Sequence, residues 1–159
     1  MLSAPSDMLR LQVHSALHQL AINMSAAFSA VFLLRQGLSP AQVFLTYSAV
    51  FVLRILFRPF ILPLLPLLGM RRMLIAGTAL IAIQYVSIAF VSGFDATLAA
   101  YIVFMAFANM LYWTLYHPVF AAAGTARDRG AQLGARQSIS ALTGIIAPSV
   151  SGFLLNLYG

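Results

Sequence analysis

The chain has 159 residues, of which 62% are apolar and only 8% are charged. Soluble domains contain roughly 45–50% apolar and about 25% charged residues, so this composition excludes an ordinary soluble globule and indicates lipid as the solvent. The net charge of +6 comes from nine arginines that lie between apolar stretches, which excludes the basic stripe of a nucleic-acid-binding protein. The absence of cysteine from the sequence excludes disulfides and thiolate metal sites.

Five apolar segments are long enough to cross a bilayer, because a transmembrane helix needs about 20 mostly apolar residues. We predict such helices over residues 13–34, 40–67, 73–91, 96–123 and 139–158, separated by breaks rich in Arg, Gly, Pro or Asp. The first apolar run is longer than a signal-peptide core, so we expect it to remain as an uncleaved span. The predicted fold is therefore all-α, a polytopic bundle forming a single transmembrane domain over residues 1–159.

The arginines predict how the bundle is oriented. Arg35 alone lies on one side of the predicted membrane, and six arginines lie on the other: Arg10, Arg71, Arg72, Arg127, Arg129 and Arg136. Short cytoplasmic loops retain arginine, so we expect a cytoplasmic N-terminus. The use of arginine without lysine, beside abundant Ala and Leu, is typical of GC-rich bacterial genomes, so the expected location is the bacterial cytoplasmic (inner) membrane.

Polar side chains in the first predicted span indicate a face that is turned away from lipid. His14 and His18 share one helix face, as metal-binding pairs do, but two ligands are too few and the sequence offers no third one nearby. We therefore predict no metal site. Asn23 lies deeper in the span, and two roles stay open for it: contact with a substrate, or a hydrogen bond to another helix.

The second predicted span contains two arginines, Arg54 and Arg58, four residues apart. Counting from Pro40 at about 1.5 Å per residue places Arg54 roughly 21 Å and Arg58 roughly 27 Å along the helix. Arg58 can therefore extend to lipid phosphate at the interface. Arg54 is too deep for that, and a cation at such depth faces a cavity or a partner. Our hypothesis is that Arg54 faces a central pathway and attracts an anionic or carboxylate-bearing small molecule.

The fourth predicted span ends in a group of aromatic and hydrogen-bonding side chains at helical spacing, which predicts one amphipathic stripe: Asn109, Trp113, Tyr116 and His117. The stripe either lines a central cavity or belongs to an interfacial aromatic belt. The position of Trp113 well inside a long span is less typical of a belt. Pro118 removes the helical donor for the carbonyl of Thr114, so we expect a kink there.

The break after the second predicted span carries a motif similar to one found in transporters of the major facilitator superfamily. The segment Gly69-Met-Arg-Arg72 corresponds to the end of the loop motif G-x-L-a-D-R-x-G-R-R of that family. The first Gly of the motif falls on Leu62 and its Asp on Pro66, so the acidic partner is replaced.

The fifth predicted span carries a second similar motif, and the resemblance extends over nearly the whole chain. Gly144-Ile-Ile-Ala-Pro148-Ser-Val-Ser-Gly152 is similar to the fifth-helix pattern G-x-x-x-G-P-x-x-G-G of the family. Small residues at this spacing allow membrane helices to approach closely. The resemblance implies the N-terminal half of a major facilitator fold, truncated before a sixth helix.

The resemblance also implies a function. It implies secondary active or facilitative transport of a small solute by alternating access, without a cofactor. In the family, several helices line the substrate cavity. The corresponding predicted spans of this chain supply six candidate cavity residues: Asn23, Arg54, Asn109, Trp113, Tyr116 and His117. The cytoplasmic gate would comprise Gly69, Arg71, Arg72 and Asp128, with a salt bridge from Asp128 to the loop arginines.

The face made by Gly144, Pro148 and Gly152 packs, in the family, against the opposite half of the transporter. We therefore expect it to face lipid or a partner, which would be the missing C-terminal half or a second chain. The alternative function is a small structural or assembly subunit that oligomerises through this helix; about seven further spans encoded after Gly159 would exclude it. An enzyme would need a nucleophile with its base or a metal set, and we predict none.

Overall fold

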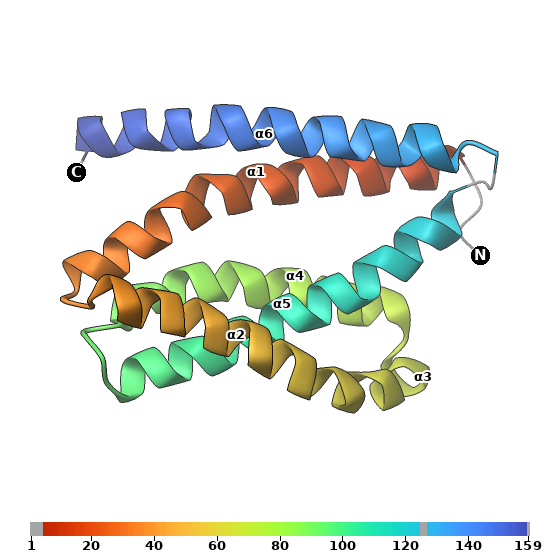
Figure 1. Cartoon of the computed structure of the whole chain (residues 1–159). Helices are drawn as coiled ribbons and strands as arrows, with labels where there is room; N and C mark the ends of the chain where they lie inside the picture. The colour runs from red at the N-terminus through yellow and green to blue at the C-terminus, as the bar shows by residue number, and fades with distance from the viewer. Residues whose placement is uncertain (1–4, 125–126, 159) are drawn as a thin grey trace. The chain divides into compact units, whose positions relative to one another are not determined.

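The computed structural model describes residues 5–124 and 127–158, and within these ranges every regular element is helical. The elements, drawn in Figure 1, are α1 (Pro5–Arg35), α2 (Pro40–Ile61), η1 (Leu62–Leu64), α3 (Leu65–Leu68), α4 (Met70–Ser87), η2 (Ile88–Phe90), α5 (Ala96–Ala123) and α6 (Arg129–Tyr158). The prediction of an all-α chain is confirmed.

Five of the helical stretches in the described ranges are long and apolar enough to cross a membrane. They are Met8–Arg35, Pro40–Leu68, Met70–Phe90, Ala96–Ala123 and Arg129–Leu157. By length and composition the chain is an integral membrane protein with transmembrane helices, as predicted.

The last helix begins earlier than expected. The predicted break over residues 124–138 is wrong for its second part, because α6 already starts at Arg129. Its first turns are polar but rich in good helix formers such as Ala, Gln, Leu and Arg, so polarity here indicates where lipid contact ends and not where the helix ends. The backbone N–H of Gln132 donates to the carbonyl of Asp128 at 2.9 Å, which places Asp128 at the start of the helix.

The chain forms two compact units. The terminal unit comprises Met1–Ser29 and Val119–Gly159, and the central unit is Ala30–Pro118. One boundary falls inside α1 and the other falls inside α5, directly after Pro118. Helix α5 continues through Pro118 to Ala123.

The turn between α1 and α2 is fixed by its own backbone. Gly37 has a φ of +88°, which a glycine adopts without strain, and the N–H of Leu38 donates to the carbonyl of Leu33 at 3.2 Å. Ser39 then caps α2: its hydroxyl accepts from the N–H of Gln42, and the side chain of Gln42 accepts from the N–H of Ser39 at 2.8 Å. Ser39 and Gln42 thus form a capping box, with proline at the first helical position.

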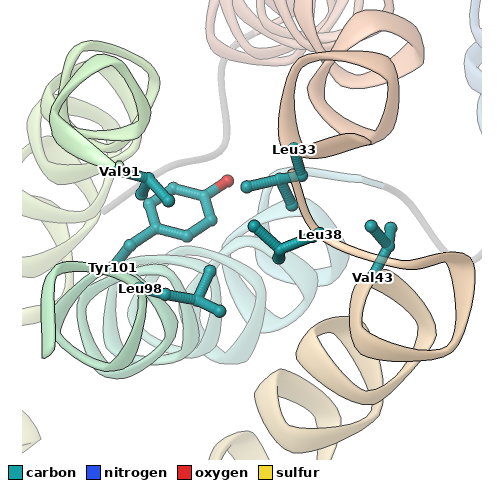
Figure 2. Packing of buried hydrophobic residues seen from close by; sticks show 6 residues of the cluster. All are labelled: Leu33, Leu38, Val43, Val91, Leu98 and Tyr101. Carbon is teal, nitrogen blue, oxygen red and sulfur yellow. The ribbon is translucent and has the colours of Figure 1, made fainter. Parts of the chain in front are cut away.

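A buried apolar cluster joins this turn to the start of α5. Figure 2 shows its six side chains pointing toward one another: Leu33, Leu38, Val43, Val91, Leu98 and Tyr101. A second cluster lies farther along the helices and joins the end of α2 to α4 and α5: Ile61, Met73, Met110, Leu111 and Leu115. These two clusters fix α5 against its neighbours in the central unit, and so position the side chains on the remaining face of α5.

Helices α4 and α5 approach closely at Gly77. A Cβ atom placed on Gly77 would lie 3.0 Å from both Cα and the backbone nitrogen of Tyr112. Only a residue without a side chain allows this distance, since carbon atoms in ordinary contact are about 3.5–4.0 Å apart. Gly77 therefore sets how near α4 comes to the middle of α5.

Candidate functional site

Within the central unit, α2 and α5 border a pocket of about 320 Å³. Its lining repeats one spacing on both helices, at positions i, i+3, i+4 and i+7: Phe51, Arg54, Ile55 and Arg58 from α2, and Met110, Trp113, Thr114 and His117 from α5. This spacing selects one face of each helix. Three of the predicted cavity residues, Arg54, Trp113 and His117, thus line the same pocket.

Arg54 places a positive charge deep in the second span. It stands at the midpoint of the stretch Pro40–Leu68, and its guanidinium carbon lies 5.4 Å from the centroid of the Phe51 ring. This is cation–π distance, so the ring supplies part of the stabilisation that water would otherwise give. Arg58 follows one turn later on the same face. Of the described residues that line the pocket, none is acidic, so the pocket carries an excess of positive charge.

The α5 side of the pocket is an aromatic wall with a fixed geometry. The Trp113 and His117 ring centroids lie 5.8 Å apart, with their planes tilted by 30°. Behind the wall, Tyr112 meets Trp113 edge to face at 5.1 Å and 87°, and Tyr116 does so at 5.9 Å and 79°. Both tyrosines are fully buried. The indole is therefore held in one orientation by residues that are themselves immobilised by packing.

The predicted stripe on the fourth span divides between the pocket and the interior. Asn109 is not among the lining residues; its side-chain nitrogen donates to Oε1 of Gln84 at 2.7 Å and to the carbonyl of Met105 at 3.0 Å. Tyr116 is 0% exposed and stacks on Tyr112 at 5.5 Å. Successive residues are rotated by about 100° around a helix, so Tyr116 and His117 cannot share a narrow face.

Gln84, which was not predicted from the sequence, is the buried hydrogen-bond partner of Asn109. It lies on α4, is 1% exposed and accepts the hydrogen bond from Asn109. Its polarity within a span was a usable signal, because buried polar groups in lipid seek one another. Thr114 and Met110, also not selected, follow from the i, i+3, i+4, i+7 pattern once Trp113 and His117 are assigned to one face.

In the terminal unit, Asn23 takes part in helix packing. Its side-chain nitrogen donates to the hydroxyl of Thr143 at 3.2 Å, and the hydroxyl of Ser151 donates to the carbonyl of Met24 at 2.9 Å. Figure 1 shows α6 alongside this part of α1. Of the two roles left open for Asn23, the hydrogen bond to another helix is the one present.

Two glycines of the small-residue face of α6 lie beside α1 within the terminal unit. A Cβ on Gly144 would lie 3.9 Å from the Asn23 amide nitrogen, and one on Gly152 would lie 3.8 Å from the Phe28 ring. At these distances a Cβ would be in ordinary contact with α1. Pro148 lies within the continuous helix α6. Gly144 itself is exposed, and the expected contact of this face with a partner remains a prediction.

The remaining predicted positions lie in the breaks. Gly69 has a φ of +78° and ends α3, with its N–H donating to the carbonyl of Leu65 at 3.0 Å. This conformation favours glycine, so Gly69 has a structural reason to be there. Arg71, Arg72 and Asp128 are exposed. The salt bridge between Asp128 and the two arginines remains a prediction.

Asp95 caps α5. Its carboxylate accepts from the side chain and the backbone N–H of Thr97, from the Ser92 hydroxyl at 2.8 Å and from the backbone N–H of Leu98 at 3.3 Å. The hydrogen bond from the Thr97 hydroxyl, followed by that from Ser92, lowers the pKa of Asp95 to about 2. The cap is therefore ionised throughout the physiological range.

Comparisons of the chain with protein-family models, with curated proteins and with solved structures find no match. The resemblance to major facilitator transporters therefore rests on the sequence motifs alone.

Proposed function

We propose that this chain is part of a membrane transporter of the major facilitator type that moves a small anionic solute by alternating access. In this proposal the bundle lies in a bacterial inner membrane with its N-terminus in the cytoplasm, and further helices complete the transport pathway. The observation that carries the proposal is Arg54, a cation at the midpoint of a span that lines a pocket of about 320 Å³.

A charge at this depth requires a functional reason. Inserting an arginine at the centre of a transmembrane helix costs about 2.5–3.5 kcal/mol on insertion scales, and such residues mark ion or solute pathways. A purely structural arginine would pair with a carboxylate, but the five spans contain neither Asp nor Glu. An anion that enters the pocket supplies the missing partner, which makes binding favourable and dependent on the charge of the solute.

The spacing of the two arginines fits stepwise passage. Arg58 lies about 6 Å farther along α2 than Arg54, at the rise of one helical turn and toward the predicted cytoplasmic end. An anion released by Arg54 therefore meets a second guanidinium before it reaches the cytoplasm. Transport needs a site that binds without retaining its solute, and two adjacent cations share the solute between them.

The test is uptake of radiolabelled small anions into proteoliposomes that contain this chain together with the helices that complete the pathway, with the chain as wild type, Arg54→Ala or Arg35→Ala. Arg35 is an exposed arginine at the end of α1 and serves as the matched control for loss of one positive charge. We expect Arg54→Ala to lower uptake by about tenfold or more, since a hydrogen bond to a charged group is worth about 1.5–3 kcal/mol. Equal uptake by all three proteins, with unchanged preference among anions, would refute the role of Arg54.

A further inference from the structure

The pocket between α2 and α5 joins two cations to a largely apolar surface, which narrows the kind of anion it fits. Its volume of about 320 Å³ lies at the lower end of the range for small-molecule sites. Phe51, Ile55, Met110 and Trp113 supply the apolar part of the lining. A small inorganic anion leaves its hydration shell without gaining anything from these walls. An anion with an apolar body covers them.

The charged part of the pocket suits a planar acid group. A guanidinium presents two parallel N–H donors, which match the two oxygens of a carboxylate. Arg54 stands at the midpoint of its span, whereas phospholipid phosphates lie outside a hydrocarbon core about 30 Å thick, so a lipid headgroup does not reach the depth of Arg54. The depth of Arg54 therefore favours a free solute over a lipid.

The aromatic wall suits a flat body. Trp113 meets two buried tyrosines edge to face, and the His117 ring lies 5.8 Å from the indole. A rigid indole offers a stacking surface without the loss of side-chain freedom that usually opposes binding. Across the pocket, the Phe51 ring already holds the Arg54 guanidinium at 5.4 Å.

We propose that the pocket binds an aromatic carboxylate, with the acid group on Arg54 and the ring against Trp113. Resting on the proposed function, this inference names the class of solute that the transporter moves.

Trp113 is the only tryptophan in the chain, so its fluorescence reports on this pocket alone. The experiment titrates the 159-residue chain, in phosphatidylcholine nanodiscs, with 4-nitrobenzoate, whose nitroaromatic ring quenches indole. Two further ligands separate the two parts of the probe: 4-nitrobenzyl alcohol keeps the ring without the charge, and acetate keeps the charge without the ring. We expect saturable quenching by 4-nitrobenzoate, only linear quenching by the alcohol, and competition by acetate that is weaker by about tenfold or more.

Variants assign the acid group to Arg54. We expect Arg54→Gln to raise the Kd for 4-nitrobenzoate by about tenfold or more, and the matched control Arg35→Gln to leave it unchanged. Arg54→Lys keeps the charge and is expected to bind more tightly than Arg54→Gln. Far-UV circular dichroism establishes that each variant is folded; should Arg54→Gln fail to fold, Arg54→Lys and the three-ligand comparison on the wild-type protein decide the matter.

Three results would overturn the inference: linear quenching by 4-nitrobenzoate, equal binding of acetate, or equal binding of the neutral alcohol. Nanodiscs that contain phosphatidylglycerol add a fourth, since a rise of the apparent Kd with the fraction of this lipid would assign the pocket to a lipid headgroup. Failure of the proposed function gives a different pattern, namely selective binding of 4-nitrobenzoate without uptake in proteoliposomes. Uptake of anions without preference for aromatic ones would instead refute the inference and leave the proposed function standing.

Discussion

The contact between Gly77 of α4 and the backbone of Tyr112 on α5 makes the packing of the central unit sensitive to a single methyl group. In Gly77→Ala the new Cβ would lie 3.0 Å from Cα and N of Tyr112 and 3.3 Å from its Cβ. These atoms belong to helix backbone and cannot rotate away, so the two helices must separate by roughly 0.5–1 Å to restore ordinary contact. Overpacking of this kind costs about 1–3 kcal/mol.

An alanine also stabilises a helix relative to glycine by roughly 0.5–1 kcal/mol, and this gain must be separated from the clash. Gly134→Ala on α6 provides the control, because a Cβ at Gly134 meets no atom within 4 Å. We expect the free energy of unfolding, measured by SDS titration with circular dichroism, to be lower in Gly77→Ala than in Gly134→Ala by about 1–3 kcal/mol. Equal unfolding free energies in the two variants would refute the close approach of α4 and α5.

Three further predictions follow from the polar contacts and the turns. Asn109→Leu leaves the buried Gln84 without its hydrogen-bond donor, so we expect it to lower the free energy of unfolding by about 1–3 kcal/mol. We expect the double variant Asn109→Leu/Gln84→Leu to recover most of that loss. If the losses of the two single variants simply add in the double variant, the pairing is contradicted. Gly69→Ala places a side chain on a residue with a φ of +78°, so we expect it to lower the free energy of unfolding by about 1–2 kcal/mol in the same titration. Gly130→Ala is the control, because a Cβ there meets no atom within 4 Å, and we expect no loss. Equal unfolding free energies in the two variants would show that the turn does not need Gly69. The pKa of Asp95 is lowered to about 2 in the folded protein, so the stability it contributes is fully present above its unfolded pKa and is lost as the pH falls toward 2. We expect the melting temperature of Asp95→Asn to change less between pH 5 and pH 2 than that of the wild type. The same pH dependence in both proteins would exclude this role.

Helix positions could be predicted from the sequence because lipid imposes a strict condition on the backbone. A span in hydrocarbon must satisfy its own hydrogen bonds, so each long apolar run becomes a helix and each break carries turn or capping residues. Helix α5 begins and ends where the pattern predicts, at Ala96 and Ala123, and α2 begins at Pro40 after its Ser39 cap. Where a helix extends beyond the lipid, this condition no longer applies, and the first turns of α6 were missed for that reason.

Partners across helices could not be predicted in the same way. Periodicity shows which side chains share a face but not which helix that face meets. Trp113 and His117 were selected correctly as neighbours, whereas their position opposite Arg54 depends on how α2 packs beside α5. The predicted stripe covered more of the helix circumference than the pocket does. Helix α5 contacts both α2 and α4, and Asn109 lies on the side that meets α4. The small residues of α6 likewise indicated helix packing, but their pattern did not identify α1 as a neighbour.

The turn between α1 and α2 has a consequence for the order in which the protein forms. The hydrogen bonds of this turn join residues between Phe32 and Val43, so they can form as soon as this stretch has been synthesised. The pocket needs α5 as far as His117 and must wait for two more spans to enter the membrane. Arg54 therefore enters the membrane before the α5 side of its pocket is present, and the site forms only when α5 arrives.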